Sequence, residues 1–203
     1  MERFFDVFLS SIALIFLSPL LLPIIIILKL TGEGEVFFMQ KRIGRNGRLF
    51  KLIKFATMLK NSPNLGTGTV TMKNDPRILP VGKFLRKTKI NELPQLLNIL
   101  LGDMSVIGPR PLTIETFGSY SSDTQGIIKG VRPGLSGVGS IIFREEEEIL
   151  HGPYASTDFY NKVIAPYKGA LEEWFVLNKG VYIYFVTTIL VYYLLLRSLL
   201  IKI

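Results

Sequence analysis

Cysteine is absent from the 203-residue sequence, and histidine occurs once, at His151. The absence of cysteine excludes disulfide bonds and zinc-thiolate sites, and it fits a reducing compartment. The single histidine follows an acidic run and lies next to a Gly-Pro pair, which indicates a loop residue rather than a member of a Ser-His-Asp triad. Any catalytic site must therefore be built from other residue types.

Acidic residues are fewer than basic ones, 16 against 24, which gives a formal net charge of +8. This charge suits nucleic acid, anionic lipid or phosphorylated substrates equally well. The mean hydropathy of +0.37 is high for a purely soluble chain, and no zinc-finger, RRM-like or helix-turn-helix spacing accompanies the basic residues. We therefore predict a membrane protein with one domain large enough for a core, and no nucleic-acid partner.

The longest run without a charged residue near the N-terminus extends from Val7 to Leu28. As a helix it would be about 33 Å long, close to the hydrocarbon thickness of a bilayer. Pro19 and Pro23 lie inside it and should bend or break the helix. Two arrangements are open: a kinked spanning helix, and a hairpin that enters and leaves through one leaflet. Basic residues follow the run and predict a cytoplasmic flank, namely Lys29, Lys41, Arg42, Arg45, Arg48, Lys51 and Lys54.

The next segments have local signals for strands, a loop and a helix cap. Residues 36–58 predict two short strands around a turn at Arg45-Asn46-Gly47. Residues 61–71 are rich in Gly, Ser, Thr and Asn, which predicts a surface loop that could serve as a substrate lid. Asp75 is expected to cap the helix that carries Phe84 and Leu85.

The segment from Arg86 to Pro111 carries the residues best suited to chemistry. Its sequence, RKTKINELPQLLNILLGDMSVIGPRP, sets Glu92 between Arg86 and Arg110. Guanidinium groups bind phosphate through paired hydrogen bonds, and a glutamate can hold a metal or transfer a proton. A helix is expected with Glu92 in its first turn, where the residue could also serve only to complement the helix dipole. The inward face of this helix is predicted from Leu93, Leu96, Leu97, Leu100 and Leu101.

This segment resembles the signature of the bacterial phosphoglycosyl transferases, the family of small monotopic membrane enzymes also described as sugar transferases. Further resemblance lies in the FFxQxRxG pattern from Phe37 to Gly44, in KFxTM from Lys54 to Met58, and in residues 131–137. The likeness covers most of residues 1–137 and fades after them. It implies transfer of a sugar-1-phosphate from a UDP-sugar to polyprenyl phosphate, the first membrane step of bacterial glycoconjugate assembly.

The same resemblance implies the positions of the site. Asn91 and Glu92 occupy the family's Asp-Glu pair, so they are the expected catalytic residues and the expected ligands of Mg²⁺. Ser18-Pro19 matches the pair that breaks the family's membrane helix, which favours the hairpin. The expected partners are UDP-sugar, polyprenyl phosphate and membrane lipid, at the cytoplasmic face of the bacterial inner membrane, with a homodimer left open. The expected substrate-binding residues are Lys54, Arg86, Pro109, Arg110 and Arg132.

Asn91 departs from the family pattern, because it places an amide where the family has its nucleophilic aspartate. An amide is a much poorer nucleophile than a carboxylate. Three explanations are open: an introduced inactivating substitution, a natural form in which Glu92 attacks or activates the polyprenyl phosphate, and a homologue without catalysis. A membrane-bound adaptor that binds substrate or a partner enzyme is the alternative of a different class. Residues 139–144 also depart from the family, so the sugar is not specified.

The C-terminal end is apolar again, without a charged residue from Val181 to Leu196. As a helix this stretch would reach about 24 Å, short of the bilayer core, which favours an interfacial helix over a second span. Aromatic residues suited to a membrane interface accompany it, namely Trp174, Tyr182, Tyr184, Tyr192 and Tyr193. The acidic run Glu145 to Glu148 predicts a solvated helix start.

The expected fold is an α/β (α+β) monotopic membrane protein in three parts. Residues 1–30 form a kinked re-entrant membrane helix, and residues 31–178 form a small cytoplasmic catalytic domain with short strands. Residues 179–203 form the apolar C-terminal helix.

Overall fold

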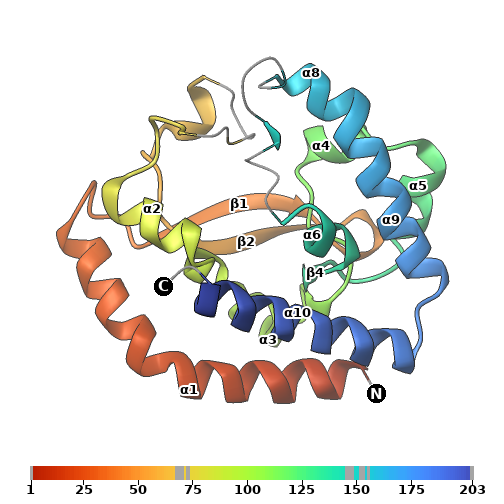
Figure 1. Ribbon diagram of the computed structural model, residues 1–203, viewed down its shortest axis with the longest axis horizontal. Helices are drawn as coiled ribbons and strands as arrows, with labels where there is room; N and C mark the ends of the chain where they lie inside the picture. The colour runs from red at the N-terminus through yellow and green to blue at the C-terminus, as the bar shows by residue number, and fades with distance from the viewer. Residues whose placement is uncertain are drawn as a thin grey trace.

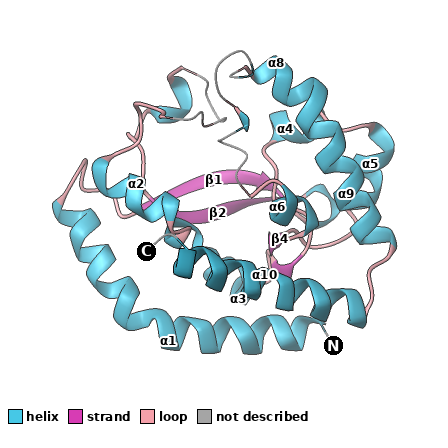
Figure 2. Cartoon of the chain, in the orientation of Figure 1, coloured by secondary structure: helices cyan, strands magenta, loops and turns pink. Residues whose placement is uncertain are grey.

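The computed structural model describes residues 2–66, 71, 74–144, 149–150, 154 and 156–201. They form a mixed α/β fold in which a β-hairpin and a two-stranded parallel sheet lie among helices (Figure 1, Figure 2). The strands are β1 (Phe37–Ile43), β2 (Leu49–Phe55), β3 (Ser105–Ile107) and β4 (Gly134–Ser136). The expected mixture of short strands and helices is confirmed.

Helices form most of the remaining structure. The long ones are α1 (Glu2–Leu30), α9 (Ala165–Leu177) and α10 (Val181–Ile201). The short ones are α2 (Pro80–Lys87), α3 (Gln95–Leu101), α4 (Ile114–Gly118), α5 (Ser122–Ile128), α6 (Val138–Ile142) and α8 (Thr157–Phe159). Single turns are the 3₁₀-helical η1 (Arg45–Gly47), η2 (Ser62–Asn64) and η3 (Ile90–Glu92), and the π-helical η5 (Tyr160–Ile164).

The hairpin of β1 and β2 confirms the strands predicted in residues 36–58. The strands are antiparallel, with Phe37 opposite Phe55. Between them, Asn46 and Gly47 adopt positive φ angles of 58° and 75°, a conformation that asparagine and glycine reach with little strain. The local turn chemistry therefore sets the register that places Lys54 near the end of β2.

Helix α1 is bent but continuous. It extends through Ser18 and Pro19 without interruption, so the break expected at this pair is a bend, which Figure 1 shows part-way along the helix. Pro19 and Pro23 each remove one hydrogen bond from the helix interior, which explains the bend. Within the described part of the chain, α1 is the one helix long and apolar enough to cross a membrane.

Both ends of α1 contact the same body of the protein. Near the N-terminus, the Arg3 guanidinium donates hydrogen bonds to the carbonyl oxygens of Ile99 and Leu100 at the end of α3. Near the C-terminal end, Leu28 belongs to a buried apolar cluster with Phe55 of β2. The helix therefore lies along the protein rather than leading away from it.

A buried carboxylate secures the N-terminal half of α1. Asp6 Oδ1 accepts hydrogen bonds from Ser105 Oγ at 2.8 Å, from Val106 N at 2.9 Å and from Tyr184 Oη at 3.1 Å. These donors come from β3 and α10, so one oxygen atom joins three elements. Tyr184, expected at a membrane interface, is buried instead, where its hydroxyl group donates a hydrogen bond to Asp6.

The helix expected to start at Glu92 begins three residues later and turns a different face inward. Glu92 ends η3, and α3 starts at Gln95. Leu97 and Leu101, predicted to pack inward, are 39% and 73% exposed. Asn98 is buried in their place, because its side-chain amide forms hydrogen bonds with the backbone of β2. A polar side chain that completes a strand edge therefore overrides the leucine pattern.

Asp75 does not cap α2, whose N-cap residue is Leu79. It forms a buried ion pair with Arg77, with 2.5 Å between Nη2 and Oδ2. Arg77 also donates to the carbonyl oxygens of Ser62 and Leu65, at 2.8 and 2.7 Å. The ion pair therefore fixes the start of the predicted lid.

Some predicted features lie outside the described residues. They are the acidic run Glu145 to Glu148, the loop residue His151, residues 67–70 of the predicted lid and the side chain of Tyr192.

Replacing Asp6 with alanine should lower the free energy of unfolding by about 3 kcal/mol, because three donors lose a buried acceptor at once. Tyr184→Phe removes one of the three hydrogen bonds and should cost about 1 kcal/mol. Thermal unfolding of the three proteins in the same detergent checks the order. Equal melting temperatures for the wild type and Asp6→Ala would contradict this account of how α1 is held.

Candidate functional site

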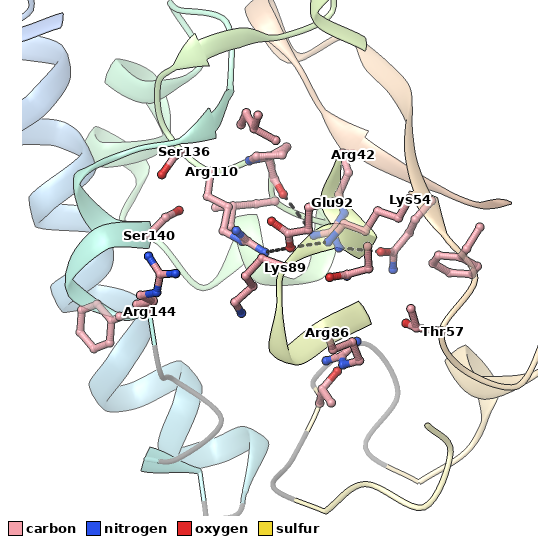
Figure 3. Close-up of a pocket in the computed structure, with 18 of the residues that line it drawn as sticks. Arg42, Lys54, Thr57, Arg86, Lys89, Glu92, Arg110, Ser136, Ser140 and Arg144 are labelled. Carbon is pink, nitrogen blue, oxygen red and sulfur yellow. Dashed lines mark hydrogen bonds and ion pairs between the residues drawn. The ribbon is translucent and has the colours of Figure 1, made fainter. Parts of the chain in front are cut away.

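A cavity of about 400 Å³ lies between the β-hairpin, η3, the turn after β3 and α6 (Figure 3). Its wall is strongly basic and includes Arg42, Lys54, Arg86, Lys89, Arg110, Arg144 and Lys168. Against these seven cations, Glu92 is the one carboxylate among the described residues that line the cavity. The volume suits a small-molecule ligand, and the excess of positive charge favours an anionic one.

Glu92 lies at the centre of the cationic wall. Its Oε1 atom is 3.1 Å from Lys54 Nζ and 2.9 Å from Arg110 Nη2. Both contacts fall on the same oxygen, and no hydrogen bond from a described residue reaches Oε2. Figure 3 shows Glu92 between the two cations, with Ser140 and Arg144 on the side of the cavity opposite Lys54.

The charges of the site oppose the effect of burial on Glu92. Burial alone would raise its pKa, but Arg110, Lys54 and Lys89 outweigh burial and hold the pKa well below the ordinary value. Burial lowers the pKa of Lys54 to about 8, although the Glu92 charge acts against this. Glu92 is therefore ionised at neutral pH, and Lys54 keeps its proton until about pH 8.

Lys89 sets the direction of the chain between α2 and η3. Its φ of 60° and ψ of 9° lie in the left-handed region, which costs a non-glycine residue about 1–2 kcal/mol. This turn allows Arg86 from α2 and Glu92 from η3 to line the same cavity. The strained backbone at Lys89 is therefore part of what shapes the basic cavity.

Asn91 presents an oxygen atom without a hydrogen-bond partner. The residue is 6% exposed and lines the cavity, and among the described residues no donor reaches its buried Oδ1. An unsatisfied buried acceptor costs about 1–3 kcal/mol. A ligand that enters the cavity could supply the missing partner.

Asn91 and Glu92 also bear on the expected magnesium ion. Within the described ranges, no group of three or more His, Cys, Asp and Glu residues could hold a metal. Magnesium ions in phosphate chemistry often use one or two carboxylates together with substrate phosphates. The free Oδ1 of Asn91 and Oε2 of Glu92 fit an ion that arrives with a phosphate-containing ligand, but do not complete a site alone.

Arg110 enters the cavity from the turn after β3. β3 pairs in parallel with β4, so that a short strand runs through the stretch of residues 131–137 that resembles the family. A side-chain carbon at Gly108 would lie 2.7 Å from Arg132 O, so glycine is required where the two segments cross. Behind the turn, the Arg110 backbone N–H faces Oε1 of Glu172 at 3.4 Å.

The structure brings together five of the seven residues expected to bind substrates or catalyse, namely Lys54, Arg86, Asn91, Glu92 and Arg110. Pro109 borders a separate cavity of about 20 Å³. Arg132 does not line the main cavity. Its Nε donates to the Gly102 carbonyl oxygen at 2.9 Å, so the unsatisfied carbonyl at the end of α3 captures this guanidinium group.

Sequence reasoning missed four of the cavity's basic residues, namely Arg42, Lys89, Arg144 and Lys168. The first two had a local signal, because Arg42 belongs to a stretch that resembles the family and Lys89 follows Arg86 by three residues. Lys168 had none: it is buried in α9 beside the rings of Phe143 and Tyr160, and only packing brings it to the cavity.

Comparisons with known proteins place this site in context. Residues 1–163 match the family described as "Bacterial sugar transferase". The exopolysaccharide production protein ExoY of Rhizobium meliloti is 39% identical over 71% of this chain and 70% of its own length. The UDP-glucose:undecaprenyl-phosphate glucose-1-phosphate transferase of Klebsiella pneumoniae is 42% identical over 69% of this chain and 30% of its own length. The UDP-N-acetylgalactosamine-undecaprenyl-phosphate N-acetylgalactosaminephosphotransferase of Aeromonas hydrophila is 37% identical over 77% and 36%. The matched region is therefore about a third of each of these two transferases.

Arg110→Ala should weaken the binding of UDP by about tenfold or more, because a charge-assisted hydrogen bond contributes about 1.5–3 kcal/mol. Arg132→Ala is the matched control and should leave UDP affinity within about twofold, because its guanidinium group binds Gly102 outside the cavity. Calorimetry on folded protein measures both. Equal losses of UDP affinity in the two variants would contradict the assignment of UDP binding to this cavity, because only Arg110 lines it.

Proposed function

The chain belongs to the bacterial sugar transferase family, and on this basis we propose that it transfers a sugar-1-phosphate from a UDP-sugar to polyprenyl phosphate. The observation that carries the proposal is the Glu92 carboxylate held between Lys54 and Arg110, in a cavity whose wall is otherwise basic. The names of the Klebsiella and Aeromonas relatives support the classes of donor and acceptor, and the name of ExoY supports a role in polysaccharide assembly.

The basic wall is the proposed binding site for the phosphate groups of both substrates. A UDP-sugar brings a diphosphate and the lipid acceptor brings a further phosphate, so negative charges accumulate in one place during the reaction. Arg86 and Arg110 can form paired hydrogen bonds with phosphate oxygens, and Lys54 adds a compact charge. Cations fixed in a partly enclosed cavity stabilise the charge that develops on the departing UMP.

Glu92 is the proposed nucleophile, because it is ionised and Asn91 carries only an amide. In the first step, an oxygen of the Glu92 carboxylate attacks the β-phosphorus, and the bond from this phosphorus to the bridging oxygen breaks, so that UMP leaves with the electron pair. In the second step, a phosphate oxygen of the acceptor attacks the same phosphorus and releases the Glu92 carboxylate. Two displacements of this kind divide one difficult transfer into two easier ones.

Asn91 and Glu92 are the residues that would hold a magnesium ion, which would supply neutralising charge to the phosphate oxygens when bound. The unpartnered Asn91 Oδ1 supports this role. Asn91 then orients the substrate phosphate rather than attacking it.

The proposed attachment to the membrane is monotopic, at the cytoplasmic face, through α1 and α10. A straight α1 of 29 residues would reach about 43 Å, yet residues near both of its ends contact the same body of the protein. This arrangement supports a re-entrant helix over a spanning one. Apolar side chains exposed along α1, such as Phe8, Phe16 and Ile26, are available to lipid. Tyr182 and Tyr193, exposed on α10, suit the interface.

Glu92→Gln should reduce the release of UMP from a UDP-sugar by about a thousandfold or more, because loss of a nucleophile removes the covalent route. The wild-type protein should form a phosphosugar adduct that fragment-ion mass spectrometry locates on Glu92. Asn91→Asp is the informative companion, because it restores a second carboxylate without removing the first. A wild type that releases no UMP, together with an active Asn91→Asp variant that carries the adduct at position 91, would refute the proposed role of Glu92.

Single cysteines at Glu2 and Thr31, in a chain that has no natural cysteine, should both react with an impermeant reagent only from the cytoplasmic side. The reason is that the two ends of α1 are held on one side by the same domain. Pro19→Leu should increase labelling of the Glu2→Cys variant from the periplasmic side, because it straightens the helix. Labelling of the two positions from opposite sides in the unmodified helix would establish a span instead.

A further inference from the structure

Glu172 of α9 is a buried carboxylate that the mechanism above does not use. It is 2% exposed, and it lies beyond residues 1–163, which match the family. Its Oε1 atom faces the backbone N–H of Arg110 at 3.4 Å. Among the described residues, Oε2 has no hydrogen-bond partner.

The surrounding backbone is shaped to this carboxylate. A side-chain carbon at Gly139 would lie 2.5 Å from Glu172 Oε1, and one at Gly137 would lie 3.3 Å from Oε2. At Gly137 the same carbon would also lie 2.2 Å from the Gly108 carbonyl oxygen. The turn before Arg110 and the start of α6 therefore close directly over Glu172, without side chains between them.

Two cations of the cavity face Glu172 from different elements. Lys168 lies one turn earlier on α9, and Arg110 lies on the turn after β3, whereas α6 contributes no charged side chain. Burial raises the pKa of Glu172 to about 7, although the hydrogen bond from the Arg110 backbone and the charge of Lys168 act against this. The carboxyl group therefore gains its charge as the pH rises through about 7.

This carboxylate is a poor choice for stability alone. A charged group with one unsatisfied oxygen is costly to bury, and a neutral side chain of the same shape would keep its contacts at lower cost. Residues that disfavour the folded state are typical of functional positions. The feature that Glu172 holds is the turn that carries Arg110, which in turn contacts Glu92.

We propose that Glu172 is a positioning residue for the transfer reaction: its carboxylate fixes the turn that carries Arg110 and so sets where this arginine meets Glu92. The inference rests on the proposed function for its kinetic consequence, but the fixing of the turn does not depend on turnover. Glu172 acts through Arg110 and does not itself line the cavity.

Glu172→Gln tests this, because glutamine keeps the shape and the oxygen acceptor but mimics the protonated acid. At pH 8 the variant should release UMP about tenfold more slowly than the wild type. At pH 6, where Glu172 is itself neutral, the two rates should be similar. The raised pKa means that Glu172 lowers stability as the pH rises from about 4.5 to above 7, so the variant should melt at a higher temperature than the wild type at pH 8.

Hydrogen exchange of the peptide that covers residues 105–112 provides a measurement without substrate. At pH 8 its amides should exchange several-fold faster in Glu172→Gln than in the wild type, because the Arg110 turn is held less firmly. Glu173→Gln is the matched control, since the neighbouring carboxylate binds Thr124 of α5 and should change neither the exchange of this peptide nor the pH dependence of the rate.

The outcomes separate the two proposals. The role of Glu172 would be overturned if Glu172→Gln changed neither the hydrogen exchange of residues 105–112 nor the pH dependence of the rate ratio between variant and wild type. It would also be overturned if the variant were both slower and less stable than the wild type at pH 8, because that pattern marks a structural residue. A wild type that releases no UMP would refute the proposed function, while faster exchange in Glu172→Gln would still establish that the carboxylate fixes the turn.

Discussion

The ion pairs of Glu92 with Lys54 and Arg110 are the interaction on which the site depends. They join β2, η3 and the turn after β3, which come from three separate parts of the chain. A carboxylate in this position without both cations would be neutral or strongly destabilising. A cluster of cations without the carboxylate would repel itself, because the charges of Arg110 and Arg42 add to the burial that lowers the pKa of Lys54. The carboxylate and the two cations therefore stabilise each other in their charged forms. Because the cavity wall holds more cations than this one carboxylate can neutralise, positive charge remains for an anionic ligand.

The features that sequence could predict are those set by neighbouring residues. The hairpin followed from two short strand-like stretches around the glycine-bearing turn at Asn46 and Gly47. The apolar helix followed from the uncharged run between Val7 and Leu28. Arg86, Glu92 and Arg110 were recognisable because they occupy one continuous motif. In these cases the physical cause, either turn geometry or hydrophobic length, acts over a few residues.

The features that sequence could not predict depend on tertiary packing. Arg132 carries the same charge as Arg110, but its guanidinium group donates a hydrogen bond to the carbonyl oxygen of Gly102. Nothing near Arg132 in the sequence indicates this contact. Leu97 and Leu101 follow the helical period yet remain exposed, because the amide of Asn98 is needed at the edge of β2. Glu172 lies in an ordinary helical stretch, and its importance appears only when the Arg110 turn is placed over it. The charge of a side chain and the helical spacing of apolar residues therefore identify candidate site and core residues, and tertiary packing decides which of them take these roles.

The anchoring of Asp6 has a consequence for the order in which the protein is assembled. Asp6 lies in the first turns of α1, whereas its partners are Ser105 and Tyr184, and Tyr184 lies 178 positions after Asp6. During synthesis, α1 leaves the ribosome long before either partner exists, so Asp6 cannot yet form these hydrogen bonds. Docking of α1 is then a late event of maturation, completed only when the last helix arrives, and contacts of such long range form slowly. A ribosome that stalls before α10 would leave a nascent chain in which Asp6 lacks the hydrogen bond from Tyr184.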